Sequence, residues 1–169
     1  METIQHRDVV KIFPGITSRT SINWSDKGLF EPAVQASGTG TRREYSIYNL
    51  VEIGVIIQLR SYGLRNNPIS NHLKKMEEVM RPLDYLAFDF GMIVRPRKPD
   101  IDFLGGRIGG EVYESMETIL LRKESFNSMR FDNIFGDLPG AEGEGRAYSA
   151  LAVDIQEIYY YVRERLNGI

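Results

Sequence analysis

The stretch Thr17–Pro32, "TSRTSINWSDKGLFEP", decides how the first half of the chain is expected to fold. Thr17 is a suitable helix N-cap, because its hydroxyl can accept a hydrogen bond from a free amide of the first turn. Gly28 is a suitable stop, since glycine adopts the conformation that ends many helices. The pattern therefore predicts a short helix over residues 18–27. Its many polar side chains and single tryptophan favour a helix that lies against another molecule.

A second short helix is expected before this one. An apolar cluster at residues 9–13 follows Asp8, and Pro14 and Gly15 end it. Two brief helices joined by a tight, glycine-containing turn are typical of a helix-turn-helix.

Residues 29–46, "LFEPAVQASGTGTRREYS", are predicted to form a two-stranded hairpin. Pro32, Gly38 and Gly40 disfavour a helix here, and the two glycines would lie at the tip. The basic and aromatic residues of the return strand are Arg42, Arg43 and Tyr45.

Two longer helices are expected after the hairpin. Ser46 is the cap of the first, which Gly63 ends, and its apolar residues recur at helical spacing. The second has Asn67 as its predicted cap and Pro68 in its first turn, and it is interrupted by Pro82. Its apolar seam suits either the core of the domain or a coiled coil with a second copy. The seam residues are Ile69, Leu73, Met76 and Met80. Together these elements predict a mainly α winged helix-turn-helix domain over residues 1–81.

Residues 82–169 show strand-like alternation and glycine-rich segments in place of helical spacing, and we expect a small α+β domain there that serves regulation or dimerisation. Apolar and other residues alternate over residues 86–94, which indicates a strand. The segment "METILLRKE" fits a strand or a helix, whereas the last segment repeats apolar residues at steps of three and four from Leu151 to Leu166 and predicts an amphipathic helix. An apolar effector could bind in the strand region, although the same side chains could form the core. These residues are Leu86, Phe88, Phe90 and Met92.

The first half of the chain resembles the N-terminal domain of MerR-type transcriptional regulators. In that family an aromatic residue ends the recognition helix and a Gly-Leu-hydrophobic-x-Pro motif follows, as in Trp24 and residues 28–32 here. The family wing closes with Arg-x-Tyr-Ser, which matches residues 43–46, and the third helix ends near Leu-Arg-x-x-Gly, which matches residues 59–63. The resemblance implies a regulator that binds a palindromic promoter site in double-stranded DNA as a homodimer and distorts it. It also leaves room for contact with RNA polymerase and for a small effector.

The N-terminal residues of a recognition helix face base edges in the major groove. Arg19 could pair with guanine or grip a phosphate, and polar residues further along could reach the DNA backbone. Trp24 could serve the interface or the small core, and the arginines of the hairpin could be DNA contacts or solvated charges. The predicted DNA-binding residues are Thr17, Ser18, Arg19, Thr20, Asn23, Trp24, Lys27, Arg42, Arg43 and Tyr45.

Composition narrows the remaining classes of function. The chain has no cysteine, so disulfides and thiolate metal sites are excluded, and we expect no metal and no cofactor. No apolar run is long enough for a membrane span, which favours the cytoplasm. No complete phosphate-binding glycine motif or nucleophile elbow occurs, so we do not expect an enzyme. The net charge of −2 is no strong sign of DNA binding. The alternative function is therefore a winged-helix module that docks on proteins.

Overall fold

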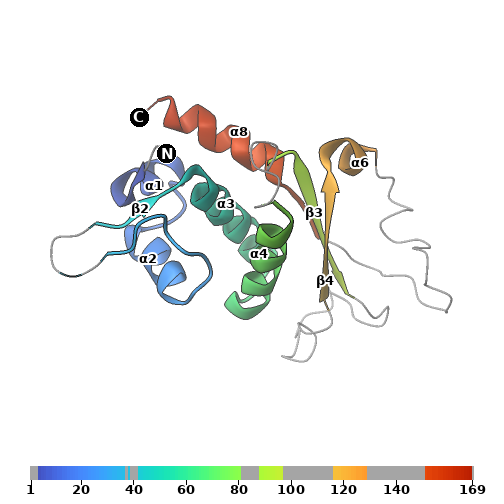
Figure 1. Cartoon of the computed structure of the whole chain (residues 1–169), viewed down its shortest axis with the longest axis horizontal. Helices are drawn as coiled ribbons and strands as arrows, with labels where there is room; N and C mark the ends of the chain where they lie inside the picture. Colours follow the sequence, from blue (N-terminus) through green and yellow to red (C-terminus); the bar gives the residue numbers. More distant parts are fainter. Residues whose placement is uncertain are drawn as a thin grey trace. The chain divides into compact units, whose positions relative to one another are not determined.

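The chain combines helices with two small antiparallel sheets, which is a mixed α+β class. The sequence predicted such a mixture for residues 82–169 and a mainly α fold before them. The computed structural model describes residues 4–36, 38, 42–80, 88–96, 116–128 and 151–168. The residues form two compact units (Figure 1). The N-terminal unit comprises Met1–Lys74 together with Ile155–Ile169, and the sheet unit comprises Lys75–Asp154.

The first two helices of the N-terminal unit are α1 (His6–Ile12) and α2 (Ser18–Asp26), which confirms both predicted short helices. The Thr17 hydroxyl accepts a hydrogen bond from the Thr20 amide at 3.2 Å, as the predicted cap requires. Gly28 has a φ of 69°, a conformation that favours glycine and that ends the helix.

The segment after α2 forms a short antiparallel pairing with the residues that enter β2 (Glu44–Tyr45). Val34 and Glu44 exchange two backbone hydrogen bonds of 3.1 Å, so the base of the predicted hairpin is present. Residues 37 and 39–41, which include most of the predicted tip, lie outside the described residues. Strand β2 (Glu44–Tyr45) also pairs with β1 (Ile4–Gln5), a strand that the sequence patterns did not indicate.

Helix α3 (Ile47–Ser61) is the centre of the N-terminal unit. Ser46 and Asn49 form a capping box at its start, and Gly63 follows its end with a φ of 88°. Nine of its residues are buried. Helix α8 (Ile155–Leu166), at the end of the chain, packs along α3 and α1 (Figure 1).

Helix α4 (Asn66–Met80) begins one residue before the predicted cap, so Asn67 belongs to its first turn. All four residues of its apolar seam are at most 2% exposed. This burial is what the core interpretation of the seam expects. Pro82 lies outside the described residues.

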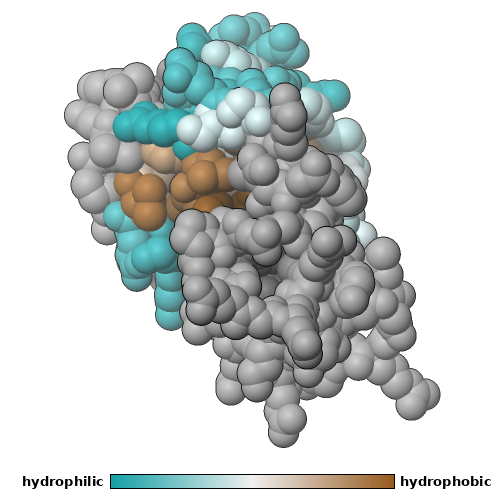
Figure 2. All heavy atoms as spheres, turned by 90° about the vertical axis from the view of Figure 1, so that its right-hand side faces the viewer, coloured by the Kyte–Doolittle hydropathy of each residue, from teal (hydrophilic) through white to brown (hydrophobic). Residues whose placement is uncertain are grey.

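The sheet unit contains β3 (Phe90–Pro96), β4 (Met116–Arg122) and β5 (Leu151–Asp154), in the antiparallel order β4-β3-β5. The segment that fitted either a strand or a helix is β4, and α6 (Lys123–Asn127) follows it directly. Half-buried apolar residues lie along β4, namely Ile119, Leu120 and Leu121. Figure 2 shows hydrophobic residues, in brown, with hydrophilic residues, in teal, above and below them.

Two boundaries differ from the sequence predictions. Leu151 belongs to β5, where it pairs with Val94, so the last helix begins only at Ile155. The apolar spacing around Leu151 fits a helix, but ladder hydrogen bonds to β3 favour the strand. The predicted second domain included residues 155–169, whereas α8 belongs to the N-terminal unit because its apolar side packs on α1 and α3.

Candidate nucleic-acid interface

Helix α2 has one polar exposed face and one buried face. Residues 19, 23, 26 and 27 stand four, three and one position apart, which places their side chains on a single stripe of the helix. All four are exposed, and they are Arg19, Asn23, Asp26 and Lys27. The opposite face is buried and contains Ser21, Trp24 and Ser25. The stripe thus presents two cations, one amide and one carboxylate to solvent.

The start of α2 is tied by its cap. The hydroxyls of Thr17 and Thr20 lie 2.9 Å apart, and Thr17 also accepts from the amide of Thr20. These two predicted DNA-binding residues are therefore hydrogen-bonded to each other. Ser18 and Arg19 are exposed beside them, where the positive end of the helix dipole favours an anion.

The two predicted aromatic contacts, Trp24 and Tyr45, lie in the core. Trp24 is 4% exposed, and the guanidinium of Arg60 lies 5.9 Å from the centre of its ring. This position matches the core role that the sequence left open for Trp24. The Tyr45 side chain is fully buried, and its hydroxyl lies 3.0 Å from Nδ1 of His6. A phosphate contact would require that hydroxyl to leave its partner.

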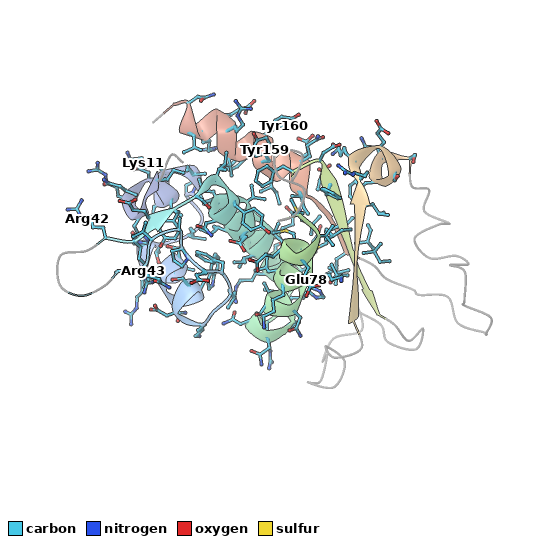
Figure 3. All side chains as sticks on the ribbon, in the orientation of Figure 1. Lys11, Arg42, Arg43, Glu78, Tyr159 and Tyr160 are labelled. Carbon is cyan, nitrogen blue, oxygen red and sulfur yellow. The ribbon has the colours of Figure 1, made fainter. Side chains whose placement is uncertain are left out.

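The two arginines before β2 occupy different environments. Arg42 is exposed, and Figure 3 shows its side chain pointing away from the ribbon. Arg43 lies beside α2, where its guanidinium donates hydrogen bonds to the carbonyl of Ile22, the hydroxyl of Ser25 and the carboxylate of Asp26 (Figure 3). The structure therefore brings Arg43 onto α2, whereas Arg42 stays exposed.

Two residues that the sequence analysis did not name belong to this site. Asp26 stands on the exposed stripe of α2, and its spacing from Arg19 and Asn23 could have indicated this. His6 forms a hydrogen bond with Tyr45, which lies 39 residues away in the sequence, and no local sequence pattern predicts that pairing.

Burial shifts the two titrating groups of the His6–Tyr45 pair in opposite directions. Burial lowers the pKa of His6, the nearby positive charge of Arg43 lowers it further, and the backbone of Ser18 opposes both. Burial raises the pKa of Tyr45, against the effect of Arg43. Both groups are therefore held neutral around pH 7, which suits a structural hydrogen bond between them.

The four residues of the predicted effector pocket are only partly described. Phe90 is 4% exposed and Met92 is fully buried, as the core alternative expects. Phe88 is half-buried, and Leu86 lies outside the described residues. Among the described residues, no group of three or more His, Asp or Glu side chains could hold a metal ion. No helix in the same part of the chain is both long and apolar enough to cross a membrane.

Neither a scan against protein-family models nor a search of curated proteins yields a match to this chain.

Proposed function

We propose that the protein is a sequence-specific DNA-binding transcriptional regulator of the MerR type, in which α2 of a winged helix-turn-helix domain enters the major groove of a palindromic promoter site. One observation carries the proposal: Arg19, Asn23 and Lys27 share the exposed face of a capped helix whose other face is buried. A helix anchored in this way can present polar side chains to DNA without rearrangement.

The chemistry of the exposed residues suits a DNA duplex. Arg19 stands in the first turn of α2, where recognition helices contact bases, and an arginine–guanine pair contributes about 1–3 kcal/mol of discrimination. Asn23 and Lys27 continue the stripe and can reach phosphate oxygens. Arg42 is a further exposed cation, next to Arg43 on the segment that leads into β2, and we expect it to contact a phosphate.

A homodimer is part of the proposal because one unit presents few cations. Phosphate contacts supply most of the affinity for DNA and weaken steeply with salt, so one copy alone would bind poorly at physiological salt. Two copies on a two-fold site double the number of contacts. Since the seam of α4 is buried, we expect the copies to pair through another surface. Contact with RNA polymerase and an apolar effector stay predictions.

The test is selection of bound duplexes from fragmented genomic DNA, followed by fluorescence anisotropy with the selected site. We expect Arg19→Ala to weaken binding to the selected site about 5- to 150-fold, and to relax preference at one base position, because a lost bidentate pair costs ~1–3 kcal/mol. Arg163→Ala is the matched control, since Arg163 is an exposed arginine on α8. It should leave both the affinity and the preference unchanged.

Two results would contradict the proposal. One is that the folded protein retains no duplex above the level of an unrelated acidic protein, which would leave docking on proteins as the better explanation. Equal losses of affinity in Arg19→Ala and Arg163→Ala would show that binding is not made through α2.

A further inference from the structure

The guanidinium of Arg43 is bound to the last turns of α2 by three hydrogen bonds. It donates to the Ile22 carbonyl at 3.3 Å, to the Ser25 hydroxyl at 2.7 Å and to the Asp26 carboxylate at 2.5 Å. Only 18% of its side chain is exposed. A planar guanidinium suits this arrangement, because its fixed fork of donors serves several acceptors at once. A cation at the C-terminal end of a helix is also favoured by the helix dipole.

The partner of this arginine lies on the face that would meet DNA. The Asp26 side chain is 54% exposed and stands on the same stripe as Arg19, Asn23 and Lys27. An unpaired carboxylate there would repel phosphate groups. The pair with Arg43 cancels that charge while it ties the strand end to α2.

We propose that Arg43 is a positioning residue, which holds α2 against the strand end and screens Asp26, and that it is not itself a phosphate contact. This inference rests on the proposed DNA-binding function for its consequence, but the pairing itself can be tested without DNA. The phosphate contacts are then made by exposed cations such as Arg42.

The two roles predict different responses to salt. A lost phosphate contact makes the dependence of log K on log salt shallower by about 0.9 for each contact. Arg42→Ala should show this change. Arg43→Ala alone should weaken binding. In an Asp26→Asn background, where no freed carboxylate repels the DNA, Arg43→Ala should leave the salt dependence as steep as in Asp26→Asn alone, because the number of phosphate contacts is unchanged.

The deciding experiment is a double-mutant cycle with Arg43→Ala and Asp26→Asn in the full chain, measured by thermal unfolding and by binding to the selected duplex. We expect Asp26→Asn to improve binding about fivefold more in the Arg43→Ala background than in the wild type, as coupling of contacting residues predicts. In the Arg42→Ala background, Asp26→Asn should act as it does in the wild type.

The unfolding measurement is independent of DNA. The melting shift of the double variant should differ from the sum of the shifts of Arg43→Ala and Asp26→Asn. Arg43→Lys should melt below the wild type, since a lysine cannot reproduce the fork.

If the melting shifts in the cycle were additive, the positioning role of Arg43 would be overturned, whatever the result of the DNA-binding measurement. If Arg43→Ala in the Asp26→Asn background made the salt dependence shallower by as much as Arg42→Ala does, Arg43 would be a phosphate contact and the proposal would be overturned. If the wild type binds no duplex but the melting shifts are coupled, the pairing of Arg43 with Asp26 is supported and the proposed DNA-binding function is contradicted.

Discussion

Gly54 of α3 lies directly against Ile158 of α8: a Cβ atom on this glycine would stand 2.3 Å from Cγ2 of the isoleucine. The closeness of the two helices depends on the missing side chain. Helix α8 thereby becomes part of the unit that carries α2, although the chain passes through the whole sheet unit before it returns. The stability of the candidate interface therefore depends on the last helix of the chain.

Gly54→Ala should destabilise the N-terminal unit by about 1–3 kcal/mol, the usual cost of overpacking a core. Alanine is intrinsically better than glycine in a helix, so a loss would show that the clash with Ile158 outweighs propensity. Gly15→Ala is the matched control, because nothing lies within 4 Å of a Cβ atom built there. Urea unfolding of both variants measures the difference. Equal stability of the two would contradict the close packing of α3 and α8.

Tyr161 provides a second link from α8, through its hydroxyl and its ring. The hydroxyl donates to the carbonyl of Ile12 at 2.9 Å, and the ring stacks on Phe13 with centroids 5.9 Å apart. Tyr161→Phe keeps the ring and should cost about 0.5–1.5 kcal/mol for the lost hydrogen bond. Tyr160→Phe, at an exposed neighbour, should cost almost nothing. A thermal-unfolding comparison in which both variants melt alike would contradict the link between α8 and α1.

Asn49 connects the start of α3 to the segment that precedes the hairpin. Its Oδ1 accepts from the Ala33 and Ser46 amides at 3.0 and 3.1 Å, and its Nδ2 donates to the Glu31 carbonyl at 2.8 Å and to Glu52 at 2.9 Å. The side chain is buried, so partners left without it would lose their hydrogen bonds away from water.

Asn49→Asp keeps the shape of this side chain but replaces its donor with an acceptor that faces the Glu31 carbonyl and Glu52. We expect a loss of about 2–4 kcal/mol at pH 7, since each unsatisfied buried group costs about 1–3 kcal/mol and the two carboxylates repel each other. The exposed Asn23→Asp change should alter stability by less than about 0.5 kcal/mol. Urea unfolding measures both variants, and a loss for Asn49→Asp no larger than that for Asn23→Asp would argue against the network.

Local signals predicted most of the helices, because caps and stops act within one turn. Thr17, Ser46 and the glycines at 28 and 63 stand where hydrogen bonds and backbone angles require them. The position of Leu151 was predicted less well, because apolar spacing alone does not show that a strand partner such as β3 is available.

The candidate site divides in the same way. The exposed stripe of α2 follows from helical spacing, so Arg19 and Lys27 could be placed from the sequence. The partners of Arg43 and Tyr45 depend on contacts between residues far apart in the chain, here Asp26 and His6. The positions of Arg43 and Tyr45 in a sequence motif therefore predicted that they contact DNA, whereas tertiary contacts direct both side chains toward other residues of the chain.

His72 of α4 makes stability depend on pH. Its side chain is 3% exposed, and burial lowers its pKa from 6.5 to about 4. Between these two values the unfolded chain binds a proton that the folded chain does not, so stability rises with pH across this window and is lost as the pH falls. A shift of this size corresponds to about 3 kcal/mol.

We expect the free energy of unfolding to fall by about 3 kcal/mol more between pH 7 and pH 4 in the wild type than in His72→Gln, which has no titrating ring. Urea unfolding at several pH values measures this difference in slope, which is independent of any constant loss that the substitution causes. His6 has a lowered pKa too, and its contribution remains in both proteins. If the free energy of unfolding changed with pH in the same way in the wild type and in His72→Gln, the pKa of His72 in the folded state would not be lowered by burial.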